Sequence, residues 1–185
     1  IRATATTFSS SNWIYGSPNA LDGEDTNAEA DTPVPIGGAP IKGDDGFRMM
    51  SSPVAGTVYD NILDPLWIQG MTNGDATGGT ANVWTYDAST PEWSALSNLN
   101  SASLTAGQGF LVFVYSDIDS DDDDDISSSK AIELYVAGQE NQATVTISTT
   151  ASEWNVLGNP FRVTIDADQL FTDNSNYTST VYVYD

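Results

Sequence analysis

The chain has 185 residues, enough to bury a sizeable hydrophobic core, and carries 26 acidic and 5 basic residues, a formal net charge of −21. This charge opposes binding to nucleic acid and to anionic lipid headgroups. The chain contains no cysteine and no histidine, which excludes disulfides, the usual zinc and copper sites, and Ser-His or Cys-His nucleophile pairs. It also lacks a run of 18 apolar residues, so we expect no direct insertion into a membrane.

Residues 1–45 are interpreted as an irregular N-terminal extension. The opening IRATATTF alternates in polarity and predicts a strand, and the stretch after it is dense in Gly, Pro, Asp and Asn, which indicates a long surface segment. Trp13 lies among these polar turn residues and is a candidate contact for a glycan, although such a tryptophan more often pins a loop. A start at Ile1 rather than Met agrees with removal of a leader or with a fragment.

From Gly46 onward, short apolar runs alternate with turns: FRMMSSPV, GTVYDNIL, LWIQGM, ANVWTYD and GFLVFVYS. Their lengths and their Val, Tyr, Trp and Phe content predict an all-β, β-sandwich-like fold. The most apolar run, 109–115, predicts a central strand buried on both faces. The run before Pro65 predicts one helical turn. Trp93 lies in a polar stretch and is a second candidate glycan contact.

An acidic run, SDIDSDDDDDISSS, follows the apolar run 109–115. We expect it to form the tip of a hairpin between that run and KAIELYV. Hard oxygen ligands at this density suit calcium, although the spacing lacks the glycine and the terminal glutamate of an EF-hand loop, and a solvated acidic loop is the commoner role. The candidate metal ligands are Asp117, Asp119, Asp121, Asp123 and Asp125.

Two alternating runs after the acidic stretch, 131–136 and 143–147, predict a hairpin closed through GQEN. Further on, TIDADQLFTDN gathers three acidic residues that suit helix capping better than calcium binding, Asp166, Asp168 and Asp173. Asn176 begins an Asn-Tyr-Thr tripeptide and is a candidate N-glycosylation acceptor.

Two stretches of the chain resemble each other. GFRMMSSPV (46–54) aligns without a gap with EWNVLGNPF (153–161) at an offset of 107 residues, and VWTYD (83–87) aligns with VYVYD (181–185) at an offset of 98. Because aromatic, aliphatic and proline positions agree in order, we predict one supersecondary unit used twice, as a first antiparallel unit over 46–137 and a second, incomplete one over 138–185. Chance recurrence of β-strand residues is the alternative.

The second unit ends before any equivalent of GFLVFVY. Either the native chain continues, or another chain supplies the missing strand by pairing at an open sheet edge. IRATATTF is a candidate donor for such an exchange. A fragment boundary explains the same ending with fewer assumptions.

Four of these motifs, GFRMMSSPV, VWTYD, GQGFLVFVY and EWNVLGNPF followed by TIDAD, resemble motifs of large secreted surface proteins of Bacteroidetes-type bacteria, many of them exported by the type IX secretion pathway. The resemblance covers roughly 46–185. It implies a non-catalytic, β-rich module of an extracellular or cell-surface protein, and it brings no catalytic residues to this sequence.

The expected function is therefore that of a non-catalytic extracellular structural or adhesive module. It would associate with itself or with neighbouring domains, as the subunit of a surface polymer or filament assembled by strand pairing and stiffened by calcium. A glycan-binding module of a larger secreted protein is the alternative, and a hydrolase that uses a pair of carboxylates is a more distant one.

Overall fold

The computed structural model describes residues 5–8, 33–35, 41, 43–54, 56–101, 103–116, 126, 132, 134–137, 144–161 and 165–174. Within these ranges, antiparallel strands dominate and helices are few and short, so the predicted all-β class is confirmed. The strands are β1 (Ala5–Phe8), β2 (Pro33–Pro35), β3 (Gly46–Met50), β4 (Val83–Asp87), β5 (Glu92–Ala95), β6 (Phe110–Val114), β7 (Tyr135–Ala137) and β8 (Val145–Ser148), and the helices are α2 (Asp60–Leu63) and α3 (Ala167–Asp173).

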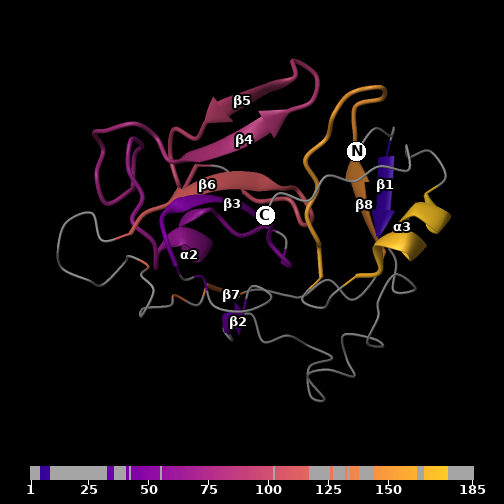
Figure 1. The fold of residues 1–185 in the computed structure, drawn as a ribbon, viewed down its shortest axis with the longest axis horizontal. Coiled ribbons are helices and arrows are strands. Elements are labelled where there is room, and N and C mark those ends of the chain that lie inside the picture. The colour runs from indigo at the N-terminus through magenta and orange to yellow at the C-terminus, as the bar shows by residue number, and fades with distance from the viewer. Residues whose placement is uncertain are drawn as a thin grey trace.

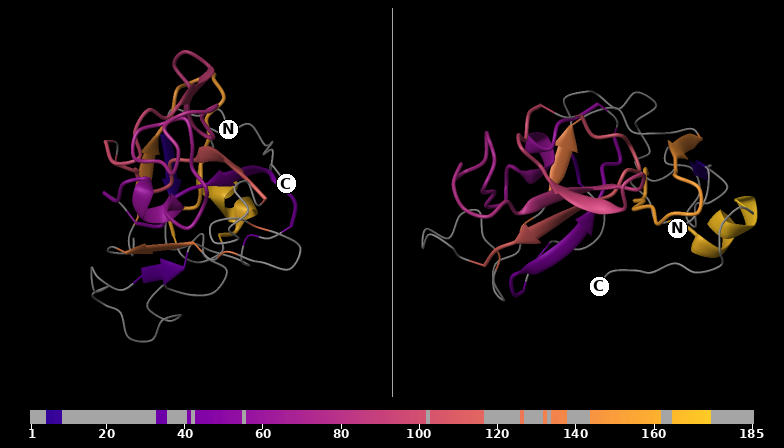
Figure 2. Two further views of the ribbon diagram at one scale, coloured as in Figure 1. Left: turned by 90° about the vertical axis from the view of Figure 1, so that its left-hand side faces the viewer. Right: turned by 90° about the horizontal axis from the view of Figure 1, so that it is seen from above.

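The largest sheet has the strand order β3-β6-β4-β5, and all its pairs are antiparallel. In Figure 1 the β2–β7 pair lies below this sheet, and the β1–β8 pair and α3 lie to its right. Figure 2 shows α3 at one end of the molecule, away from the four-stranded sheet. The described residues thus form one four-stranded sheet and two separate strand pairs, an arrangement in which the predicted sandwich is not established.

β6 occupies a central position in the sheet, as its apolar sequence predicts. Phe110, Val112 and Val114 point to the inner face and are fully or almost fully buried, whereas Leu111 and Phe113 are only half-buried. The prediction of burial on both faces is therefore wrong for this strand. A continuous apolar run also suits a strand whose outer face is partly covered by neighbouring aromatic rings.

The strands predicted around GQEN exist, but their predicted pairing is wrong. β7 pairs with β2 and β8 pairs with β1, so the two lie in different sheets. Within the described residues, the extension 1–45 contributes the strands β1 and β2, which pair with β8 and β7. Alternation of polar and apolar residues determines which side chains of a strand share a face. It does not determine which other strand hydrogen-bonds to its backbone.

The hairpin predicted around the acidic run is also wrong, because the hydrogen-bonded neighbours of β6 are β3 and β4. The two ends of the run nevertheless lie close together. Ser116 and Ile126 form an isolated parallel bridge, and the N–H of Ile126 donates to the carbonyl of Tyr115 at 3.3 Å. The chain therefore leaves β6 and returns to nearly the same place ten residues later.

The two helices follow local sequence signals. α2 ends just before Pro65, as predicted, and buries Ile62 and Leu63 completely. α3 is capped by Asp166, whose Oδ1 accepts the backbone N–H groups of Asp168 and Gln169 at 2.9 and 3.1 Å. Such a cap satisfies donors that the first turn of a helix otherwise leaves unpaired.

Positions 107 residues apart share local structure. The N–H of Val54 donates to Ser52 Oγ at 3.1 Å, and the N–H of Phe161 donates to Asn159 Oδ1 at 2.9 Å. α2 begins at position 60 and α3 at position 167, which differ by the same 107 residues. The likeness is incomplete. Residues 46–50 form the full strand β3, whereas the aligned residues 153–157 make an isolated bridge at Leu157. The duplication stays a prediction, which these shared features support.

The segment 107–114 pairs with both stretches of the predicted repeat. Its second part, β6, pairs with β3. Its first part pairs with 156–158, since the N–H of Gly158 donates to the carbonyl of Gly107 at 2.8 Å and Gln108 bridges Leu157. The motifs GQGF and WNVLG are therefore bonded to each other in the fold.

Candidate functional site

The β4–β5 hairpin carries the most exposed strand of the large sheet. All four residues of β5 are exposed, and the strand pairs with β4 along one side. The N–H of Leu96 donates to the carbonyl of Val83 at 2.9 Å, and residues bonded in this way alternate along an antiparallel ladder. It follows that Trp93 and Ala95 turn their backbone N–H and C=O groups away from the sheet.

The opposite edge strand, β3, has a different outer side. By the same alternation, Phe47 turns its backbone carbonyl outward. Arg48 covers this position, since its guanidinium donates to the carbonyls of Phe47 at 3.0 Å and Asp44 at 3.3 Å. Charged side chains on an edge strand discourage pairing with another chain. Of the two sheet edges, β5 is thus the one without such a cover among the described residues.

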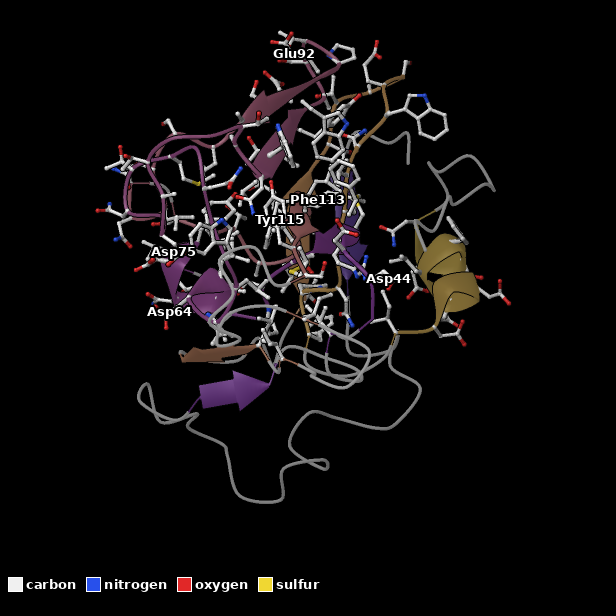
Figure 3. The ribbon with its side chains drawn as sticks, turned by 60° about the vertical axis from the view of Figure 1, so that its left-hand side comes forward. Asp44, Asp64, Asp75, Glu92, Phe113 and Tyr115 are labelled. Carbon is white, nitrogen blue, oxygen red and sulfur yellow. The ribbon has the colours of Figure 1, made fainter. Side chains whose placement is uncertain are left out.

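Aromatic rings cluster on the outer face of the sheet. Phe47 packs against Trp84 and Phe113 with ring centroids 5.7 and 5.0 Å apart, and Phe113 packs against Tyr115 at 4.9 Å. Figure 3 shows Phe113 and Tyr115 side by side. On the hairpin, Trp93 packs against Tyr86 at 5.2 Å with an interplanar angle of 57°. These contacts stiffen the face and leave Trp93 41% exposed.

A groove of about 810 Å³ lies between the β4–β5 hairpin and the chain around β8. Its walls carry many hydroxyl groups, among them those of Thr85, Ser94, Ser103, Thr105, Thr146 and Ser148. Its apolar lining comes from Leu96, Ile147, Val156 and Leu157. The pairing of 107–109 with 156–158 holds the second wall beside the first, so the groove depends on the contact between the two motifs. From here on it is called the hairpin groove.

Two ionisable groups in the lining of the hairpin groove, those of Tyr59 and Asp87, have pKa values that differ from the ordinary ones. Burial raises the pKa of the Tyr59 hydroxyl, because a buried phenolate loses its hydration. Hydrogen bonds from the hydroxyl and backbone N–H of Ser89 lower the pKa of the Asp87 carboxyl, which accepts them at 2.7 and 2.8 Å. Tyr59 therefore stays a neutral donor, and Asp87 is the one charged residue among the described lining residues.

Of the candidate glycan contacts, calcium ligands and glycosylation acceptor, Trp93 is the one within the described ranges. It is exposed beside Tyr86, as a glycan contact requires, although Trp93 itself does not line the hairpin groove. The other candidates lie outside the described residues: Trp13, Asn176, Asp117, Asp119, Asp121, Asp123 and Asp125.

The acidic side chains that the structure does describe are dispersed. Figure 3 shows Glu92 and Asp44 apart from each other and from Asp64 and Asp75, which lie on the same side of this view. Among the described residues, no three Asp or Glu side chains gather as a metal site would require. In the same ranges, no helix is long and apolar enough to span a bilayer.

The sequence did not single out Tyr59 or Gln108 as groove residues. Tyr59 precedes α2 in an apolar run that reads as core, and its ring does pack edge-to-face on Phe110 at 5.1 Å. Gln108 lies between two glycines, which was the available signal of a close backbone approach. The hydroxyl residues of the lining come from strands and from the segments between them, and nothing in their spacing sets them apart.

Searches with this sequence against known protein families, curated proteins and solved structures found no match. The function is therefore inferred from the β4–β5 hairpin, the exposed edge of β5 and the hairpin groove.

Proposed function

We propose that the chain is a non-catalytic structural or adhesive β module of an extracellular or cell-surface protein. It associates with copies of itself or with neighbouring domains by β-strand pairing, as the subunit of a surface polymer or filament. The observation that carries this proposal is the outer edge of β5, where Trp93 and Ala95 present backbone donors and acceptors that no described residue bonds. Such a row of groups is a template for an added strand.

The composition supports an extracellular setting. The net charge of −21 keeps separate molecules soluble through mutual repulsion, and the pairing edge must overcome this repulsion locally. β5 contains a single charged residue, Glu92, at its first position. The remaining three residues are neutral, so strand pairing along them does not bring like charges directly opposite each other.

The test replaces Ala95 with proline. Proline removes an N–H that points away from β4, so the hairpin keeps its own hydrogen bonds, while an incoming strand loses a donor. We expect the parent protein to form oligomers or filaments as its concentration rises, in sedimentation velocity and electron microscopy. The Ala95→Pro variant should stay monomeric.

The matched control is Ala95→Ser, which keeps the backbone N–H and should assemble like the parent. Circular dichroism of both variants establishes that the sheet is retained. A parent protein that stays monomeric at about 1 mM, the range of weak association, would overturn the proposal. So would a folded Ala95→Pro variant that assembles as well as the parent.

A further inference from the structure

The lining of the hairpin groove combines many hydroxyl groups with apolar side chains. A ligand that fills it must offer many hydrogen-bonding groups and also apolar surface. The volume of about 810 Å³ lies in the range of small-molecule binding sites and accommodates several small rings. This combination separates the hairpin groove from a purely apolar cleft that would dock another protein element.

Tyr59 provides a second, independent observation. It lines the groove, its side chain is 3% exposed, and its hydroxyl has no hydrogen-bond partner among the described residues. A buried hydroxyl without a partner is costly, and native proteins seldom tolerate one away from a ligand or an ordered water. The hydroxyl of Tyr59 is therefore available to a ligand that enters the groove.

The charges around the groove exclude anionic ligands. Its described lining contains no lysine or arginine, and Asp87 at the end of β4 stays ionised. The net charge of −21 adds repulsion at longer range. Phosphorylated, sulfated and carboxylated ligands are consequently disfavoured, and a neutral ligand fits the charge of the groove better.

The groove also offers apolar surface. Leu96, Ile147, Val156 and Leu157 lie among the hydroxyl groups of its lining. The C–H faces of sugar rings match such a surface, and sugar hydroxyls match the walls. Trp93 does not take part, because it lies on the other face of the hairpin from Ser94, which lines the groove.

We propose that the hairpin groove binds a neutral oligosaccharide. Tyr59 and Gln108 hydrogen-bond to its hydroxyl groups, and Leu96 and Val156 pack against its rings. This site is separate from self-association, since it uses the side chains that line the groove rather than the outward backbone groups of β5. A monomeric variant such as Ala95→Pro should therefore still bind the sugar.

The experiment titrates the full chain with three neutral hexasaccharides, of β-1,4-linked glucose, mannose and N-acetylglucosamine. A hexagalacturonate and an uncharged Ser/Thr-rich hexapeptide serve as the acidic and peptide comparisons. Binding is measured by isothermal titration calorimetry, and the site by shifts of the backbone amide signals of Gln108 and Thr146. We expect a neutral hexasaccharide to bind and to shift both signals, and the two comparison ligands not to bind.

The decisive variant is Tyr59→Phe, which keeps the ring against Phe110 and removes only the hydroxyl. It should weaken saccharide binding about tenfold, the loss expected for one good hydrogen bond. Phe47→Ala is the control, since Phe47 is 39% exposed on the opposite edge strand and does not line the groove.

Three results would overturn the proposal. The first is that none of the three neutral hexasaccharides binds at about 1 mM. The second is that the Tyr59→Phe variant, shown to be folded, binds as tightly as the parent. The third is that the hexapeptide binds in their place, which would assign the groove to an extended polypeptide. None of these results affects the strand-pairing test at Ala95.

Discussion

Gly158 lies where the two stretches of the predicted repeat touch. A Cβ atom at this position would overlap Cβ and Oγ of Ser51, the residue 107 positions earlier. Ser51 Oγ also donates to the carbonyl of Asn159 at 3.1 Å, which fixes the two chains at this distance. The glycine of the WNVLG motif is thus required by close packing.

Replacing Gly158 with alanine should destabilise the protein by about 1–3 kcal/mol, the usual cost of forcing an extra group into a packed site. Urea unfolding measures the change. Gly78→Ala is the control, because nothing lies within 4 Å of a Cβ built there. The double variant Ser51→Gly, Gly158→Ala should recover part of the loss, and strict additivity of the two single changes would contradict the proposed contact.

Asn82 is the most heavily bonded buried polar residue of the sheet. Its side chain accepts the N–H of Gln69 at 2.9 Å and donates to the carbonyls of Trp67 and Phe113 at 2.9 and 3.0 Å. Asn82→Ala leaves these groups unpaired and should cost at least about 2 kcal/mol. Thermal unfolding with the exposed Asn100→Ala as control checks this, and equal losses would show that the bonds contribute little.

At the scale of elements, the turn between β4 and β5 is held by Asp87. Its carboxylate accepts two hydrogen bonds from Ser89, which hold its pKa below the ordinary value of 3.8. A lowered folded-state pKa means that the turn gains stability above the unfolded pKa and loses it as the pH falls through the folded one.

NMR titration of the Asp87 carboxyl carbon should therefore show a midpoint below that of an exposed aspartate. Ser89→Ala removes the hydroxyl donor, the largest cause of the shift, and should raise the midpoint. The Glu92 carboxyl, at the other end of the turn, reports any general change in the hairpin. A midpoint of Asp87 that does not respond to Ser89→Ala would show that the hydroxyl does not bond it.

The elements differ in how far the sequence predicts them. Alternating or apolar runs predicted β6 and β8, and a proline predicted the end of α2, because these signals are local. The partners of β7 and β8 were not predictable in this way, since β1 and β2 come from more than a hundred residues earlier. Pairing depends on which backbone groups remain open in the folded chain.

The hairpin groove shows the same limit on function. Trp93 could be singled out because an aromatic residue among polar ones suggests exposure. Tyr59 could not, because its apolar neighbours indicate core, and only the fold brings it beside Gln108 and the residues around β8. A site assembled from three distant segments leaves no fixed spacing in the sequence.

At the scale of the whole molecule, the net charge of −21 should make stability depend on salt. Like charges repel more strongly in the compact state, and salt screens this repulsion over the Debye length, about 30 Å at 0.01 M and 10 Å at 0.1 M. We expect the melting temperature to rise when sodium chloride increases from about 10 mM to about 100 mM. No rise would mean that repulsion among the acidic residues contributes little to the free energy of unfolding.

A comparison of calcium with sodium distinguishes general screening of charge from binding of calcium at the acidic run 117–125. If Asp117, Asp119, Asp121, Asp123 and Asp125 hold calcium, as proposed from the sequence, calcium chloride should raise the melting temperature more than sodium chloride of equal ionic strength. Ser116 and Ile126, which flank the run, form a bridge, so the two ends of the run already lie close together. Replacing the five aspartates with asparagine should abolish the difference between the salts while retaining the sodium effect. An equal response of parent and variant to calcium would exclude the run as a binding site.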